Sequence, residues 1–219
     1  MRFMVFRSLV FGPLFLLLNL FLLQVVSQGQ AIKDSSLLQK TVSMGMVDVY
    51  VSQALEFLAD NYRIPAGIEI VSSRRTKKVP EKRISIMLLQ SPLETVLDAI
   101  VQADPSYRWE VNDGVVNLLP KDKEDSLVNI EVKSFQIDNL SRLEVKKAIV
   151  DLPEVASKLK SLGLEPAAIS LWPGRDKRDH LRLSLSLRNT TLRDILNEIA
   201  KRTKFWAVSV FGEFFLVQI

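Results

Sequence analysis

Hydrophobic and polar residues follow two different periods in the segments 84–88 and 93–100. In the first segment every second residue is apolar, which is typical of a strand that buries one face. In the second segment the apolar residues are three and four positions apart, which is typical of a helix that buries one side. The same succession returns 99 residues later, at 183–187 and 192–199. The pattern therefore predicts one pair of strand and helix twice.

The segments that follow these two helices also correspond. Each consists of two runs rich in apolar residues with a turn between them, at Asp113-Gly114 in the first half and at Phe211-Gly212 in the second. Asp-Gly between such runs is a strong signal for a β-hairpin, and Phe-Gly is a weaker one. We therefore predict a hairpin after each helix.

The two halves also correspond in the segment that precedes each strand–helix pair. Amphipathic helices are predicted at 51–62 and 143–163, each after a strand-like segment. The first helix is followed by IPAGIEI (64–70) and the second by EPAAISL (165–171). Each half is therefore predicted to follow the order β-α-β-β-α-β-β.

Capping residues mark three of the predicted helix starts. Ser91-Pro92-Leu93-Glu94 has serine at the N-cap, proline at the first helical position and glutamate at the third, which predicts a capping box. Ser141 and Glu144 have the same spacing, and Thr190 or Thr191 is expected to cap the last helix.

The predicted fold class is α+β, with two tandem small domains in which two helices pack on a small mixed sheet. The first domain is expected at 38–120 and the second at 121–219, with Pro120 and the charged run KDKED (121–125) at the seam. The alternative is that amphipathic α/β sequences resemble one another in general. The recurrence of element order, caps, hairpins and the Pro-Ala motif favours a duplication.

The N-terminal segment 1–31 is expected to be a signal peptide. Arg2 and Arg7 precede an apolar run of 19 residues at 8–26, and Gly29-Gln30-Ala31 fits a small-x-small cleavage site. The alternative is an uncleaved anchor in the inner membrane, because a run of this length can span a bilayer. We expect a periplasmic protein, which contacts a membrane only through this segment if the segment is uncleaved.

The side chains that most catalytic and metal sites require are scarce. The chain has no cysteine, and its one histidine, His180, lies in a charged segment where an exposed histidine is ordinary. No glycine-rich phosphate loop and no aspartate-rich calcium loop occurs in the sequence. We therefore expect no catalytic residue, no metal and no cofactor. An envelope enzyme, which is the alternative, would have to use scattered carboxylates.

The chain also resembles a known family. In the first half the likeness lies in SQALEFLADNYRIPAGIEI (52–70) and ISIMLLQSPLETVLDAIVQADPSYRWEVNDGVVNLLP (84–120). In the second half it lies in LSLSLRNTTLRDILNEIAKRTKFWAVSVFGEFFLVQI (183–219). These stretches resemble the short N-terminal domain (STN domain) shared by secretins and TonB-dependent outer-membrane receptors. The resemblance implies a small periplasmic module that docks other envelope proteins.

Three segments offer candidates for binding. The basic stretch 72–83 is expected to steer association with phospholipid head groups, an anionic glycan or an acidic protein partner, or else to be a solvated loop. The aromatic residue of SLWPGR (170–175) is difficult to bury in such a segment. The C-terminal strand EFFLVQI (213–219) is expected to be either an edge strand that pairs with a partner strand or an inner strand. The candidate binding residues are Arg74, Arg75, Lys77, Lys78, Trp172, Phe215 and Val217.

The predicted function is that of an exported, non-catalytic protein-interaction module of the cell envelope. The expected partners are envelope proteins, such as a component of a secretin, pilus or TonB-dependent system. Without the segment 1–31 the formal net charge is only +2, and export separates the chain from nucleic acid, so nucleic acid is not expected as a partner. The alternatives are a carboxylate enzyme and a membrane-tethered structural protein.

Overall fold

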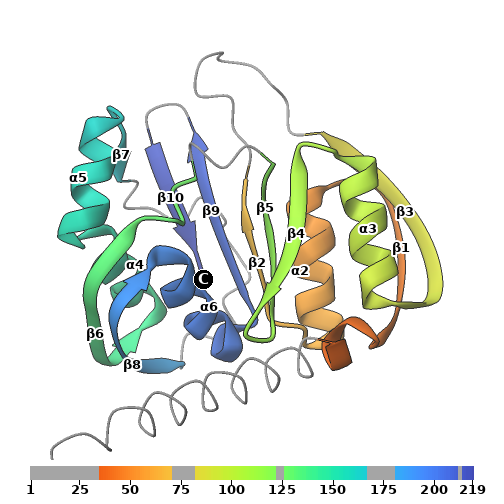
Figure 1. Cartoon of the computed structure of the whole chain (residues 1–219), viewed down its shortest axis with the longest axis horizontal. Coiled ribbons are helices and arrows are strands. Elements are labelled where there is room, and N and C mark those ends of the chain that lie inside the picture. Colours follow the sequence, from red (N-terminus) through yellow and green to blue (C-terminus); the bar gives the residue numbers. More distant parts are fainter. Residues whose placement is uncertain (1–34, 71–81, 122–125, 167–180, 212–213) are drawn as a thin grey trace, which may run out of the picture.

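The computed structural model describes residues 35–70, 82–121, 126–166, 181–211 and 214–219 (Figure 1). The expected signal segment 1–31 lies outside these ranges. The fold is α+β, as predicted. The first half contains β1 (Thr41–Tyr50), α2 (Val51–Tyr62), β2 (Ala66–Glu69), β3 (Arg83–Pro92), α3 (Leu93–Ala103), β4 (Tyr107–Asn112) and β5 (Val115–Pro120). The second half contains β6 (Glu131–Ser141), α4 (Arg142–Val150), α5 (Pro153–Ser161), β7 (Glu165–Pro166), β8 (Arg182–Thr191), α6 (Leu192–Thr203), β9 (Phe205–Phe211) and β10 (Phe214–Gln218).

One six-stranded sheet lies at the centre of the molecule, in the order β4-β5-β2-β9-β10-β7. The sequence pattern predicts a small mixed sheet in each half, and the structure joins the strands of both halves into one sheet. The first half supplies β4, β5 and β2, and the second half supplies β9, β10 and β7. The two sets meet where β2 pairs with β9 in parallel.

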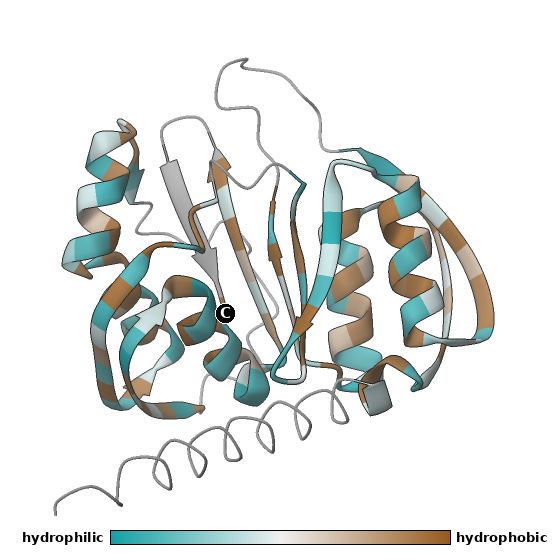
Figure 2. Cartoon of the chain, viewed as in Figure 1, coloured by the Kyte–Doolittle hydropathy of each residue, from teal (hydrophilic) through white to brown (hydrophobic). Residues whose placement is uncertain are grey.

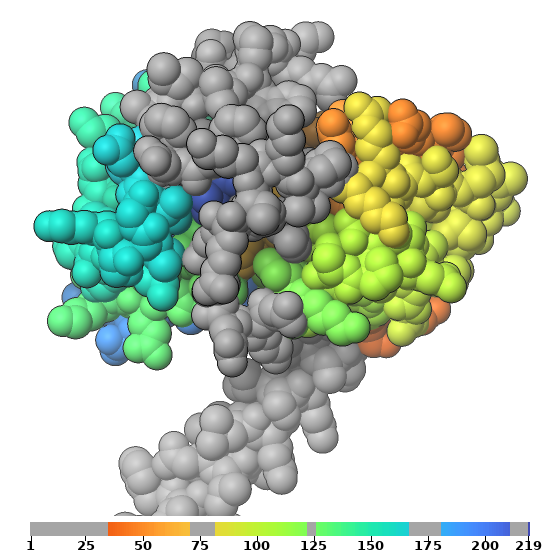
Figure 3. All heavy atoms as spheres, turned by 90° about the horizontal axis from the view of Figure 1, so that it is seen from above, coloured from red at the N-terminus to blue at the C-terminus, as the bar shows by residue number. Residues whose placement is uncertain are grey.

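Two further strand pairs form two-stranded ribbons, β1 with β3 and β6 with β8, both antiparallel. The β1–β3 ribbon lies on the outer side of α2 and α3 (Figure 1), and Figure 2 shows that β3 is apolar (brown) along much of its length. Seen from above in Figure 3, the first half (orange to light green) and the second half (green to blue) lie toward opposite ends of the molecule. Each half therefore has the layers ribbon, helices and sheet.

Strand directions define how the halves are related. Strand β5 is antiparallel to β4 and parallel to β2, and β2 is parallel to β9, so β9 runs opposite to β4. The order of corresponding strands across the sheet is nevertheless the same in both halves. This combination requires a half-turn about an axis that runs across the strands. Such a half-turn places the helices of the two halves on opposite faces of the sheet.

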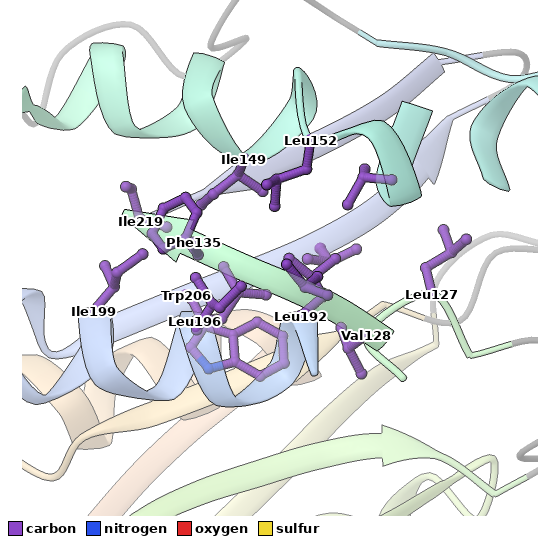
Figure 4. Close-up of a cluster of buried hydrophobic side chains, with 14 of the residues drawn as sticks. Leu127, Val128, Phe135, Ile149, Leu152, Leu192, Leu196, Ile199, Trp206 and Ile219 are labelled. Atoms are coloured by element: carbon purple, nitrogen blue, oxygen red, sulfur yellow. The ribbon is translucent and has the colours of Figure 1, made fainter. Parts of the chain in front are cut away.

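The packing of the junction agrees with this relation. Side chains of a strand point alternately to the two faces of its sheet. Phe205 and Ala207 of β9 belong to the buried cluster of the first half, whereas Trp206 and Val208 belong to the cluster of the second half. Figure 4 shows the Trp206 ring beside α6 in this second cluster. The sheet is therefore packed on both faces where the halves meet.

The two ribbons also agree in backbone detail. Asp48 in β1 and Asn139 in β6 both have positive φ angles, of 55° and 52°. In each case the backbone N–H donates to a serine hydroxyl on the paired strand, to Ser85 at 3.0 Å and to Ser184 at 2.9 Å. Both bulges interrupt the register at the same place relative to the following helix. These shared irregularities support the interpretation of the halves as copies of one unit.

Two of the three predicted helix caps are present. Ser141 with Glu144 and Thr191 with Asp194 form capping boxes at the starts of α4 and α6. The capping box predicted at Ser91 is wrong. Helix α3 begins after Pro92, which stays in extended backbone, and no side chain caps its first turn.

The long helix predicted at 143–163 is two helices, α4 and α5. Helix α4 ends at Val150, and α5 begins at Pro153. Proline has no N–H to donate and clashes with the preceding turn, so a helix cannot continue through it without strain. Proline is favoured at the first position of a new helix, which is the position that Pro153 takes.

We predict that Gly67→Ala lowers the free energy of unfolding by about 1–3 kcal/mol or more, as overpacking of a close-packed interior does. A Cβ atom at Gly67 would lie 1.9 Å from Cε2 of the buried Trp206 ring. Urea-induced unfolding followed by circular dichroism measures the change. The matched control is Gly45→Ala, because a Cβ there lies 3.3 Å from the flexible Met87 Sδ. The control is expected to change stability by less than about 0.5 kcal/mol, and equal effects of the two substitutions would contradict the packing described.

Candidate functional site

Most of the predicted binding residues lie outside the described part of the chain. These are Arg74, Arg75, Lys77 and Lys78 of the basic stretch, and Trp172. Their roles in binding remain predictions.

The C-terminal strand β10 lies inside the sheet. It pairs with β9 on one side and with β7 on the other. Phe215 is opposite Val210 in β9 and opposite Pro166 in β7, and Val217 is opposite Val208. The expectation of an edge strand at Phe215 is therefore corrected, and the alternative of an inner strand holds there. The reason is topological: the strand after the first helical segment of the second half, β7, returns to the outer side of β10.

The described ranges hold no group of three or more His, Cys, Asp or Glu side chains arranged to bind a metal ion. His180, the residue on which a catalytic triad would depend, is not among them. In the same ranges, no helix combines the length and the apolar character needed to cross a membrane.

An ionic cluster connects the β4–β5 hairpin of the first half to α6 of the second. Glu110 in β4 forms ion pairs with Arg108 and with Arg193. Asn112 donates from Nδ2 to Asp194 Oδ1 at 3.2 Å. The residues that form these contacts across the halves are more than 80 positions apart, so no local pattern in the sequence predicts them.

Lys201 on α6 extends this cluster to the hairpin turn. Its Nζ contacts the carboxylates of Asp113 and Glu198. Burial alone would lower the pKa of Lys201, but the hydrogen bonds and charges of the two carboxylates outweigh burial and raise this pKa above its ordinary value. The amine therefore stays charged over the whole physiological range, and the cluster is a structural contact between the halves.

The outer face of the β1–β3 ribbon carries exposed apolar side chains. Val47 is 71% exposed, Met87 70% and Leu89 75%. Gly45 pairs with Met87, and its missing side chain leaves room for the Met87 thioether. The inward residues of the same strands, such as Met44, are fully buried. The ribbon therefore has apolar residues on both of its faces, and only one of them is covered in the described structure.

The corresponding face of the second ribbon is polar. Ser186 and Arg188 in β8 lie 99 residues after Met87 and Leu89, and all four side chains are exposed. Val47 follows Met46 and Asp138 follows Ile137, and each is the first residue of the bulge that precedes the helix in its ribbon. We call Val47, Met87 and Leu89 the apolar ribbon face.

The sequence contained a signal for this face that pattern analysis missed. The strand segment ISIMLLQ (84–90) has apolar residues at outward positions where LSLSLRN (183–189) has serine and arginine. Strict alternation accounts for the second segment and leaves Met87 and Leu89 in the first unexplained.

Comparison of the chain with models of known protein families, with curated proteins and with solved structures gives no significant match.

At the start of α4, the capping box lowers the pKa of Glu144. The hydroxyl of Ser141 donates to Glu144 Oε2 at 2.6 Å and its backbone N–H at 2.7 Å, and Arg182 adds an ion pair at 3.2 Å. The Ser141 side chain makes the largest contribution to this shift. Because the pKa is lower in the folded chain, the stabilisation is present above the unfolded pKa and is lost as the pH falls through the folded pKa.

We predict that Ser141→Ala raises the pKa of Glu144 toward its unperturbed value, since the hydroxyl donor is removed. An NMR titration of the glutamate side-chain carboxyl groups measures this change. Glu154 is an internal control, because its pKa is lowered by backbone N–H groups of Glu154 and Lys133, which the substitution leaves in place. An unchanged Glu144 pKa in the variant would contradict the assigned cause.

Proposed function

We propose that the chain is an exported, non-catalytic protein-interaction module of the cell envelope, which docks a partner protein through the apolar ribbon face. The resemblance to the STN domain supports the location and the class of function. The single observation that carries the proposal is the difference between the two ribbons. Equivalent outward positions are apolar in the first ribbon and polar in the second.

The apolar ribbon face is an unusual arrangement for side chains that serve only the fold. The three residues are 70–75% exposed, so they contribute little burial to the hydrophobic core. The second ribbon keeps the bulge before its helix and the pairing next to it with polar residues there, although the first ribbon has a further register shift between Val42 and Met44. Apolar residues are therefore not needed to form this part of the ribbon. Neighbouring apolar side chains on a protein surface are typical of an interaction site.

An exposed ion pair at the end of the ribbon also supports the proposal. Arg83 forms an ion pair with Asp48 at 2.9 Å at the end of the ribbon, and both side chains are at least half exposed. An apolar centre with a polar, hydrated rim is the usual composition of a protein–protein interface. The partner is an envelope protein, and a component of a secretin, pilus or TonB-dependent system remains the expected kind.

Site-directed photocrosslinking in the exporting cell tests the docking surface. A photoreactive p-benzoylphenylalanine at Met87 is expected to give a crosslink to one envelope protein, which mass spectrometry identifies. The same residue placed at Ser186 is the matched control, because it occupies the equivalent position of the polar ribbon. Equal crosslinking at both positions, or none at Met87 in correctly exported protein, would contradict the proposal.

Substitution of the three residues of the apolar ribbon face distinguishes a role in partner binding from a role in folding. The triple variant Val47→Asp, Met87→Ser, Leu89→Arg gives the first ribbon the polar residues of the second. We expect loss of binding to the crosslinked partner, with a change in unfolding free energy within about 1 kcal/mol because surface substitutions are usually mild. A variant that unfolds and loses binding in equal measure would assign these residues to the fold.

Export is tested separately by mass spectrometry of the mature chain. Cleavage after Ala31 is expected to leave an N-terminus at Ile32 in a periplasmic fraction. A full-length chain in the membrane fraction would instead support the membrane-tethered alternative.

A further inference from the structure

The central sheet ends at β4, and this edge is separate from the apolar ribbon face. Within the described residues no strand lies beyond β4. The strand has six residues and pairs with β5 on its inner side along its whole length. An edge strand presents outward backbone N–H and C=O groups, which are a template for an added strand. In β4 the Tyr107 N–H is not one of them, because it donates to the Asp104 carbonyl at 3.2 Å, so the template lies at Trp109 and Val111.

Strand β4 corresponds to β9 in the second half. Each strand directly follows the last helix of its half, α3 or α6. Each is also paired in equal register with the next strand, with Asn112 opposite Val115 and Phe211 opposite Phe214. The outer edge of β9 is occupied: β2 lies there, parallel to it. Among the described residues, β2 occupies this edge of β9, and no strand occupies the corresponding edge of β4.

The occupied edge shows which backbone groups make the contact. Ala66 N–H donates to the carbonyl of Lys204 at 3.0 Å, and Ile70 N–H donates to the carbonyl of Val208 at 2.8 Å. The counterpart of Val208, 99 residues earlier, is Trp109 in β4. Because the hairpin has a two-residue turn, Asn112 and Val115 form a hydrogen-bonded pair. Hydrogen-bonded and non-hydrogen-bonded residues alternate along an antiparallel strand, so the backbone N–H and C=O of Trp109, three residues earlier, point away from β5.

The occupied edge also shows which side chains fit. Gly67 in β2 lies opposite Trp206, and the indole fills the space that any side chain at position 67 would need. The counterpart of Trp206 in β4 is Tyr107, another large aromatic residue that is 4% exposed. By this correspondence, a strand added to β4 is expected to carry a small residue opposite Tyr107.

The usual protection of an edge strand is weak at β4. Natural edges often carry outward charged side chains that oppose pairing. The charged side chains of β4, Arg108 and Glu110, are paired with each other, and Glu110 also binds Arg193 on α6. These side chains are only 26% and 33% exposed, and Glu110 is held in the contact between the halves.

From this correspondence we propose that the outer edge of β4 binds an extended peptide segment of a partner protein as a parallel strand. The segment carries glycine or alanine opposite Tyr107, as β2 carries Gly67 opposite Trp206. It donates a backbone N–H to the Trp109 carbonyl, as Ile70 does to Val208. The chain itself supplies a model of such a ligand in IPAGIEI, residues 64–70.

The test uses the full mature chain and capped synthetic peptides, with NMR to locate the bound peptide. The peptide IPAGIEI is expected to bind saturably and to shift the amide signals of Trp109 and Val111. A peptide with valine in place of the central glycine is expected to bind at least about tenfold more weakly, which corresponds to about 1.4 kcal/mol. A peptide methylated on the backbone nitrogen of its last isoleucine is expected to lose binding to a similar degree.

Substitution in the protein gives an independent readout. Val111→Pro removes the outward N–H that follows the Trp109 carbonyl along the edge, at a position where an edge strand tolerates proline. It is expected to weaken peptide binding while circular dichroism stays unchanged. If the variant fails to fold, the two modified peptides still decide the question on the unaltered protein.

Three results would overturn the proposal. The first is equal affinity for the three peptides. The second is a set of signal shifts confined to β9, which would mean that the peptide displaces β2. The third is that the chain associates with itself at high concentration, loses this association in Val111→Pro, and does not bind the free peptide. That result would mean that a second copy of the chain, and not a partner peptide, pairs with the edge of β4. None of these results bears on the apolar ribbon face, so the two sites are tested separately.

Discussion

The packing of Trp206 over Gly67 is the contact on which the arrangement of the whole molecule depends. The indole is fully buried, and its Nε1–H donates to Asn197 Oδ1 at 2.9 Å, so the ring has a fixed orientation. Only a residue without a side chain leaves room for the ring on the neighbouring strand. Because this neighbour belongs to the other half, one glycine allows two sets of three strands to become a single sheet.

The half-turn between the halves determines which surfaces remain available. It places the two helix layers on opposite faces of the sheet and the two ribbons at opposite ends of the molecule. Corresponding positions therefore have different surroundings, even though the halves share element order and backbone bulges. The outer edge of β9 is covered by β2, whereas no strand of the described part of the chain pairs with the outer edge of β4. One ribbon has a polar outer face and the other an apolar one, so a repeated unit can provide two different surfaces.

Local sequence patterns predicted the elements well and their assembly poorly. Spacing of apolar residues located α3 and α6, and short-range chemistry located the caps at Ser141 and Thr191, because these features depend on residues within a few positions. The junction between β2 and β9 joins residues about 140 positions apart, and periodicity carries no information about such a pairing. The ionic contacts of Glu110 and Lys201 were missed for the same reason.

Two errors arose where one residue overrides a pattern. Pro153 divides an otherwise continuous amphipathic segment into α4 and α5, and Pro92 stays in strand conformation instead of opening α3. The candidate site was missed because its evidence was a deviation from alternation at Met87 and Leu89. The deviation could be interpreted only in the structure, which places both residues on the outer face of a ribbon, at the positions equivalent to Ser186 and Arg188.

The central claim is that β9 and β4 present corresponding strand edges, and that among the described residues a strand occupies only the edge of β9. Hydrogen–deuterium exchange of two corresponding backbone amides, those of Val208 and Trp109, measures this difference within one sample. The register places the Val208 N–H in the parallel pairing with β2, so it is expected to exchange only on global unfolding, whereas the Trp109 N–H is expected to exchange orders of magnitude faster. Equal protection of the two amides, or rapid exchange at Val208, would contradict the account.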